Sequence, residues 1–145
     1  MRTVITFGTF DVLHIGHINI LQRAKKHGDR LIVGVSSDAL NFSKKSRNPV
    51  YSEFERTSII AALNCVDEVF IEESLELKGE YIKKHNADVL IMGDDWAGRL
   101  DMYSELCEVI YLPRTEGIST SQLIAEIKNY GEDIINSLII NVNPV

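Results

Sequence analysis

The chain has 145 residues, of which 45% are hydrophobic and 25% charged, and its formal net charge at pH 7 is -6. This length and composition predict one globular domain with a core of its own. The acidic balance disfavours a nucleic-acid-binding or membrane-surface protein, and no apolar run approaches the roughly 20 residues of a membrane span. Since no secretory signal pattern is present, we expect a cytoplasmic protein.

Short apolar runs alternate with amphipathic segments along the chain. Strands are predicted at 3–7, 30–36, 68–71, 89–92 and 109–112, and helices at 18–27, 52–63, 75–85 and 119–130. This alternation predicts a single doubly wound α/β domain over residues 1–130, with a central parallel five-stranded sheet. Ligands of such sheets bind beyond the carboxyl ends of the strands.

Three segments do not follow the alternation, and one of them, residues 94–103, comes directly after a predicted strand and carries acidic residues and Trp96. Residues 41–50 are polar and basic, and they are predicted to form a mobile loop. Residues 131–145 carry an apolar patch and form a C-terminal appendage of uncertain order. For this appendage the sequence leaves three alternatives open, namely a packed extension, an intersubunit strand and a partly ordered end.

The strand at 3–7 runs directly into the sequence GTFDVLHIGH, residues 8–17, and a helix is predicted to follow. A helix N-terminus favours bound anions because its first N–H groups are unpaired and its dipole end is positive. Imidazoles of His14 and His17 placed there could add donors to a phosphate. Two other interpretations stay open. The histidines could make all of their hydrogen bonds within the turn, or they could bind zinc as a pair, although no third ligand stands at a familiar spacing. Asp11 is placed either to form the turn or to help hold a cation.

Two further polar loops follow predicted strands. RTEGISTS, residues 114–121, combines an arginine, a glycine and several hydroxyls, of which one helix cap explains only one. GDDW, residues 93–96, carries carboxylates that suit a turn cap, ribose hydroxyls or Mg²⁺ equally. Neither the P-loop pattern GxxxxGK[ST] nor the dinucleotide fingerprint GxGxxG occurs. We therefore expect three strand-end loops to form a triphosphate site of another kind.

GTFDVLHIGH, GDDW and RTEGIST, in this order, resemble the cytidylyltransferase family of HxGH nucleotidylyltransferases over about residues 2 to 130. The resemblance implies a Rossmann-like fold, a homodimer and Mg²⁺ or another divalent cation. It implies the transfer of CMP from CTP to a small polyol phosphate, which yields a CDP-polyol and pyrophosphate. Glycerol 3-phosphate is the first choice of acceptor and glycerol 2-phosphate or a similar compound the next. The product would serve cell-surface polymers of the teichoic-acid or capsule type.

The resemblance also implies a role for individual residues. Catalytic roles fall on His14, His17, Lys44 and Arg114. Nucleotide contacts fall on Gly8, Thr9, Phe10, Gly16, Asp94, Arg114, Gly117, Ile118, Ser119 and Thr120. Contacts with the acceptor and the phosphates fall on Asp11, Lys44, Arg56 and Lys78. No strong direct metal ligand is expected: Mg²⁺ would be held through the phosphates, with Asp11 or Asp94 as candidate protein ligands.

Two positions depart from the family pattern. Ser46 stands where the family commonly has a second lysine, and Leu75 stands where it has a tryptophan. Both fall near the expected acceptor site, so the acceptor is less well determined than the use of CTP. Two alternative functions remain: an ATP-dependent adenylyltransferase acting on a sugar phosphate or flavin precursor, and a nucleotide-binding regulator without catalysis.

Overall fold

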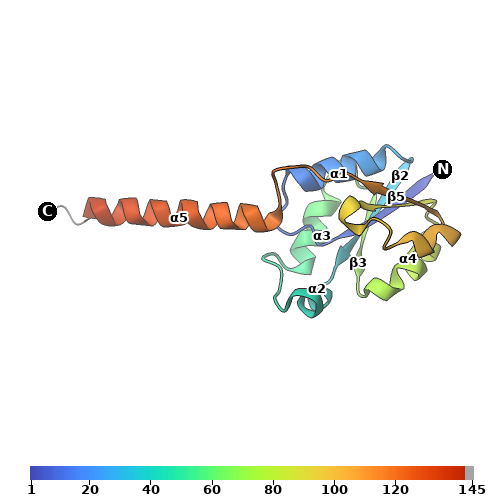
Figure 1. Cartoon of the computed structure of the whole chain (residues 1–145), viewed down its shortest axis with the longest axis horizontal. Helices are drawn as coiled ribbons and strands as arrows, with labels where there is room; N and C mark the ends of the chain where they lie inside the picture. Colours follow the sequence, from blue (N-terminus) through green and yellow to red (C-terminus); the bar gives the residue numbers. More distant parts are fainter. Residues whose placement is uncertain (143–145) are drawn as a thin grey trace.

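A computed structural model describes residues 1–142 (Figure 1). Strands and helices alternate as the sequence predicts, with short 3-10 helices in the connections. The strands are β1 (Thr3–Gly8), β2 (Arg30–Ser36), β3 (Glu68–Glu72), β4 (Val89–Gly93) and β5 (Glu108–Leu112). The α-helices are α1 (Ile15–Lys25), α2 (Asp38–Lys45), α3 (Glu53–Ala61), α4 (Lys78–Lys84) and α5 (Thr120–Val142). The 3-10 helices are η1 (Leu75–Leu77), η2 (Asp94–Trp96) and η3 (Asp101–Glu105).

The five strands form one parallel sheet in the order β3-β2-β1-β4-β5, which confirms the predicted Rossmann-like doubly wound architecture. β1 lies at the centre, between β2 and β4. The chain therefore winds outward from β1 in one direction through β3, and in the other through β5. The change of direction lies between β1 and β4, where sheets of this kind open a crevice for a ligand.

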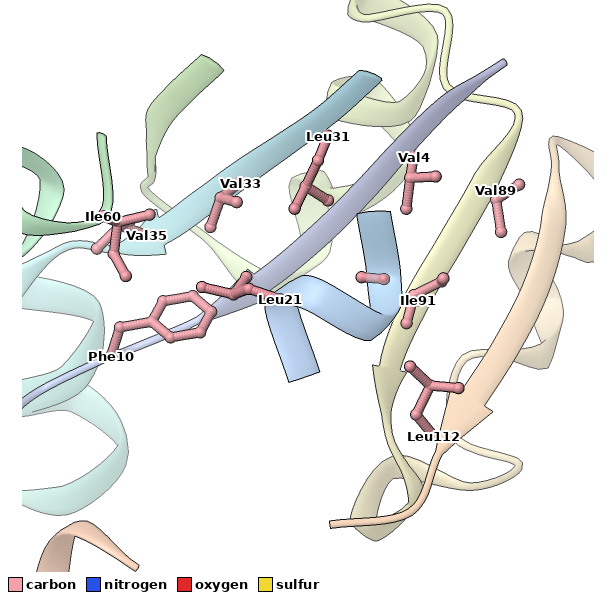
Figure 2. Close-up of a cluster of buried hydrophobic side chains, with 11 residues drawn as sticks. Val4, Phe10, Leu21, Leu31, Val33, Val35, Ile60, Val89, Ile91 and Leu112 are labelled. Carbon is pink, nitrogen blue, oxygen red and sulfur yellow. The ribbon is translucent and has the colours of Figure 1, made fainter. Parts of the chain in front are cut away.

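The sheet is buried on both faces, which explains why its strands have little polar alternation. On one face, side chains of the central strands pack against Leu21 of α1 and Ile60 of α3 (Figure 2). On the other face, Ile5, Ile32 and Leu90 pack with Ile82 of α4. Adjacent residues of one strand thus serve two different halves of the core.

Part of the predicted mobile loop is helical. The prediction for residues 41–50 is wrong at 41–45, because these residues belong to α2. The Ser37 hydroxyl caps this helix by accepting the Leu40 N–H at 3.0 Å, and the buried Asn41 amide donates to the Ser37 carbonyl. α2 ends at Ser46, whose φ of 56° is left-handed. The exposed basic residues Lys44 and Lys45 therefore form the last turn of a capped helix that has one buried side.

The last helix runs through the expected end of the domain. α5 continues from Thr120 to Val142, whereas the sequence predicts a helix over 119–130, and it leaves the domain as a single rod (Figure 1). The prediction of a domain boundary at residue 130 falls inside this helix. Residues 131–142 are not an intersubunit strand, and 143–145 lie outside the described residues. Among residues 1–142, no helix is both long and apolar enough to cross a bilayer.

Candidate active site

A cleft of about 880 Å³ opens at the carboxyl ends of the strands. The loops after β1, β4 and β5 line it, together with the end of α2 and the segment between β3 and α4. The cleft brings together all of the predicted site residues except Arg56, Asp94 and Gly117. The histidine loop and the β5–α5 loop, which are about 100 residues apart in sequence, thus face one space at the change of strand direction.

The two histidines stack at the N-terminus of α1. Their ring centroids lie 3.8 Å apart at an interplanar angle of 23°. His14 Nδ1 accepts the Gly16 N–H at 3.0 Å, and His17 Nδ1 accepts the His14 N–H at 3.2 Å, which completes a capping box. α1 consequently begins at Ile15, three residues before the predicted start.

These hydrogen bonds determine where the imidazoles carry their protons. Burial lowers the pKa of His17 to about 4, and the charge of His14 acts in the same sense. Burial also lowers the pKa of His14, followed by the charge of Arg114. Both rings are therefore neutral at pH 7, and each Nδ1 is occupied as an acceptor, which assigns the proton to Nε2. The pair offers two Nε2–H donors without carrying charge.

Gly16 is required by the close approach of the two loops. A Cβ at this position would lie 2.8 Å from Cε1 of His14 and 3.3 Å from Cγ2 of Ile118 in the β5–α5 loop. The first distance is below van der Waals contact, so a side chain would displace the His14 ring. The absence of a side chain at Gly16 therefore allows the His14 ring to cap α1. This role is additional to the room that the glycine leaves for a ligand.

The loop between β1 and α1 is conformationally strained. Phe10 and Val12 have positive φ angles of 53° and 50°, a region that β-branched Val12 rarely adopts. Three contacts hold the loop in place: the buried Phe10 ring, a bond from Arg56 to the Thr9 carbonyl, and the Thr120 hydroxyl donating to the Asp11 carbonyl at 2.9 Å. Strain that the surroundings maintain in this way is concentrated at functional sites.

The β5–α5 loop supplies the opposite wall of the cleft. The Ser119 hydroxyl accepts the Gln122 N–H at 3.1 Å and so caps α5, while Thr120 is bonded to the histidine loop. Arg114 is exposed, with Nη1 3.9 Å from the Asp95 carboxylate. The N-terminal ends of α1 and α5 thus border one cleft, and both favour bound anions.

Arg56 is fully buried and acts as an internal connector. Its Nη1 donates to the Thr9 carbonyl at 2.9 Å and to the Ser36 carbonyl at 2.7 Å, and its Nη2 donates to Asp38 at 2.8 Å. Nε donates to the carbonyl of Tyr51 at 3.0 Å. Every guanidinium nitrogen therefore bonds to a protein oxygen, and Arg56 does not line the cleft. Its predicted contact with phosphate stays a prediction; in this structure the side chain positions the loops.

Asp11 fixes the basic loop that follows α2. Its two carboxylate oxygens accept the N–H groups of Val50 at 2.7 Å and Tyr51 at 3.0 Å. The side chain lines the cleft, but its lone pairs are partly committed to these amides. The other predicted carboxylate, Asp94, is exposed and lies outside the cleft lining, which instead includes Asp95.

The donor set does not fit a metal ion held by the protein alone. Within residues 1–142, no three His, Cys, Asp or Glu side chains gather as a metal site requires, and this also leaves His14 and His17 without a third zinc ligand. Asp11 is engaged with backbone amides, and Asp95 faces Arg114. A divalent cation in this cleft would have to be held mainly by phosphate oxygens.

A buried ion pair lies at the far end of the cleft. Lys78 Nζ is 2.5 Å from a Glu72 carboxylate oxygen, and the two side chains are 2% and 1% exposed. The Ser36 hydroxyl donates to the other Glu72 oxygen, and the ammonium lies 4.7 Å from the Phe7 ring centroid and 5.4 Å from that of Trp96. Glu72 is not among the site residues predicted from the sequence. Its position could have indicated a role in the site, because Glu72 is the last residue of β3 and ligands bind beyond the carboxyl ends of the strands.

With this geometry in view, comparison with known proteins identifies the family. A family model described as Cytidylyltransferase-like matches residues 5–126. The chain belongs to this family. Cytidylyltransferase-like proteins are nucleotidyltransferases, so the sequence-based prediction of family and enzyme class is confirmed. The matched segment includes all three motif loops and ends inside α5.

Individual relatives agree with the family assignment. The chain is 49% identical over 128 residues to the glycerol-3-phosphate cytidylyltransferase of Bacillus subtilis (strain 168), which covers 88% of this chain and 98% of that protein. It is 43% identical over 133 residues to the Staphylococcus aureus (strain NCTC 8325 / PS 47) protein of the same name, covering 92% and 98%. The crystal structure of a lipopolysaccharide core biosynthesis protein from Thermoplasma volcanium GSS1 superposes with a TM-score of 0.71 at 24% identity, covering 80% of this chain and 99% of that chain. This last likeness shows the fold alone.

Proposed function

We propose that this cytidylyltransferase-like enzyme transfers CMP from CTP to glycerol 3-phosphate and releases CDP-glycerol and pyrophosphate. The observation that carries the proposal is the pair of Nε2–H imidazole donors between two helix N-termini at the change of strand direction. The choice of CTP and glycerol 3-phosphate rests on the similarity to two relatives named glycerol-3-phosphate cytidylyltransferase, which are 49% and 43% identical to this chain.

In the proposed reaction, a phosphate oxygen of the acceptor attacks the α-phosphorus of CTP in line. The new bond joins this oxygen to the α-phosphorus, and the bond to the β-phosphate oxygen breaks, so that pyrophosphate leaves. A phosphate monoester is already anionic at pH 7, so no strong base is needed. Catalysis then consists of alignment and stabilisation of charge on the transferring group.

His14 and His17 would donate from Nε2 to the α- and β-phosphate oxygens. Because both rings are neutral before binding, their contribution is directional hydrogen bonding rather than fixed charge. Lys44 at the end of α2 and Arg114 after β5 would balance the charge of the pyrophosphate. Phosphate oxygens would be the main ligands of a bound Mg²⁺, which would supply charge neutralisation, since within residues 1–142 no three His, Cys, Asp or Glu side chains gather as a metal site requires.

The acceptor would bind at the Lys78 end of the cleft. Lys78 is neutralised by Glu72, so its proposed contribution to phosphate binding is smaller than that of a free ammonium. Leu75 lies at this end of the cleft and Ser46 ends α2. The segment 46–52, which Asp11 holds by two backbone bonds, would close over the bound substrates and exclude water.

Three finer expectations are part of this proposal. The enzyme would act in the cytoplasm, work as a homodimer, and supply CDP-glycerol for cell-surface polymers of the teichoic-acid or capsule type. They rest on the resemblance of the sequence and on the similarity to the relatives named above.

The experiment is a pyrophosphate-release assay with CTP and ATP in parallel. Glycerol 3-phosphate, glycerol 2-phosphate and phosphocholine serve as acceptors. The variant His17→Ala removes a cleft histidine, and His27→Ala, two residues beyond the C-terminal end of α1, is its matched control. Release that requires both CTP and glycerol 3-phosphate supports the proposal. Release with ATP alone indicates an adenylyltransferase, and CTP binding without turnover indicates a regulator; either outcome contradicts it.

A further inference from the structure

The buried ion pair of Glu72 and Lys78 forms part of the wall of the cleft, although the two side chains are only 1% and 2% exposed. A buried pair adds little to stability, because taking both charges out of water costs about as much as their attraction returns. Stability therefore does not explain why two charges stand at the end of the cleft. Their place in its wall indicates a role toward a ligand.

The hydrogen bonds of the Lys78 ammonium are incomplete. The group carries three N–H donors, and among the residues that the structure describes it donates to one oxygen, that of Glu72. Nζ also lies 4.7 Å from the ring centroid of Phe7 and 5.4 Å from that of Trp96, and neither ring offers an oxygen. An oxygen atom of a ligand in the cleft can therefore accept a hydrogen bond from Lys78.

The Glu72 carboxylate has spare capacity of the opposite kind. One of its oxygens accepts from Lys78 and the other accepts from the Ser36 hydroxyl at 3.1 Å. An ionised carboxylate has about four lone-pair sites, so Glu72 can accept further hydrogen bonds but cannot donate one. The pair thus presents a donor and an acceptor side by side. A hydroxyl group, which both accepts and donates, matches the two at once.

A phosphate group does not match this pair. A phosphate oxygen bound to Lys78 would bring its negative charge close to the Glu72 carboxylate, which lies 2.5 Å from Nζ in a site that water screens poorly. The pair as a whole carries no net charge to balance a phosphate dianion. An uncharged hydroxyl meets no such repulsion, so the pair favours the hydroxyl-bearing part of a ligand.

Other cations of the cleft are available to the phosphate of the acceptor. Lys44 and Arg99 both line the cleft, and neither makes an ion pair among the side chains described. Arg99 lies close to the Lys78 end, because its guanidinium carbon is 4.6 Å from the centroid of the Trp96 ring. A guanidinium suits a phosphate, to which it can donate two parallel hydrogen bonds.

We propose that Glu72 and Lys78 form a hydroxyl-binding subsite, in which hydroxyls of the acceptor accept a hydrogen bond from Lys78 and donate one to Glu72. Phe7 and Trp96 supply apolar surface for the carbon chain. The pair then selects polyol phosphates over phosphate monoesters without hydroxyls, because an acceptor that lacks them covers the pair without replacing its lost water. This assignment rests on the proposed function and specifies which part of the acceptor the pair binds.

A comparison of glycerol 3-phosphate with n-propyl phosphate tests the subsite, because the two share a three-carbon chain and a phosphate and differ in the hydroxyls. The value of kcat/KM with CTP is measured for each. We expect the wild-type enzyme to prefer glycerol 3-phosphate at least about 100-fold. The double variant Glu72→Gln/Lys78→Met removes both charges without leaving one of them unpaired, and its preference should fall below about 10-fold.

An exposed ion pair on α4 provides the matched control. Lys83 Nζ lies 3.8 Å from the Glu80 carboxylate, and both side chains are exposed. The double variant Glu80→Gln/Lys83→Met makes the same two substitutions away from the cleft, and its preference for glycerol 3-phosphate should stay within about twofold of wild type. Far-UV circular dichroism verifies that both double variants are folded.

Two results overturn the hydroxyl-binding subsite alone. The first is a wild-type enzyme that uses the two acceptors equally well, and this comparison needs no variant. The second is a folded Glu72→Gln/Lys78→Met protein that keeps the wild-type preference; if its activity on both acceptors falls in equal proportion, the pair serves the phosphate instead. Absence of CTP-dependent pyrophosphate release with every acceptor contradicts the proposed function itself, and the subsite with it.

Discussion

Replacing Arg56 with lysine keeps the positive charge but removes the planar guanidinium, whose three nitrogens donate to four protein oxygens. The guanidinium makes four hydrogen bonds to protein oxygens, and a single ammonium can keep about two of them. Each lost bond to a charged donor is worth about 1.5–3 kcal/mol, so the loss of two should lower the free energy of unfolding by about 3–6 kcal/mol. A chain of this length has roughly 7–20 kcal/mol of stability, so the variant should still fold.

Urea unfolding of Arg56→Lys, followed by circular dichroism, measures this loss directly. At a slope of about 2 kcal/mol per M, the midpoint should fall by about 2 M. Arg23→Lys is the control, because Arg23 makes one exposed bond to the Pro113 carbonyl and should cost at most about 1 kcal/mol. An Arg56→Lys protein as stable as wild type, but with its CTP turnover abolished, would show that Arg56 is a phosphate ligand and not a positioning residue.

Three further changes probe the cleft. His14→Ala or His17→Ala should each lower the turnover number about 100-fold, since each removes a donor to the transferring phosphate; near-normal pyrophosphate release in a folded variant excludes that role. Lys78→Met should cost about 3–5 kcal/mol in urea unfolding by leaving the Glu72 carboxylate buried alone, and adding Glu72→Gln should recover part of the loss; a double variant no more stable than Lys78→Met contradicts the pairing. Because the pKa of His17 is about 4 in the folded chain and 6.5 in the unfolded chain, the unfolded state takes up the proton first as the pH falls. The free energy of unfolding should therefore drop by about 2.5 kcal/mol between about pH 6.5 and 4, and His17→Ala should remove this part of the pH dependence.

The fold was predictable because burial on both faces leaves a clear trace in the sequence. Strands such as 89–92 are continuously apolar, and the stretches between them have helical periodicity. The histidine loop and the β5–α5 loop were predictable as parts of one site because polar motifs directly follow strands. In a parallel sheet, those positions converge on one edge.

The features that sequence analysis missed depend on contacts between distant segments. Arg56 has the pattern of a helix-surface cation, and its burial follows from carbonyls of Thr9, Ser36 and Tyr51 that converge only in the folded chain. Glu72 lacked a role because its partner Lys78 belongs to the next helix.

For α2 and α5, local sequence patterns failed to predict where a helix lies and where it ends. The basic residues at 44–47 obscured the capped helix that precedes them. Gly131 resembles a helix stop, yet one glycine costs only about 1 kcal/mol inside a helix and does not end it.

The central position of β1 has a consequence for how the chain folds while it is being synthesised. Residue Ile5 pairs with Ile32 on one side and with Leu90 on the other, so half of the sheet can form from the first part of the chain while the second edge of β1 waits for β4. The cleft is complete only when Thr120 has left the ribosome and bonded to the histidine loop. Until β4 has paired with β1, the nascent protein carries an unpaired apolar strand edge, and chains that terminate before β4 will tend to aggregate through it.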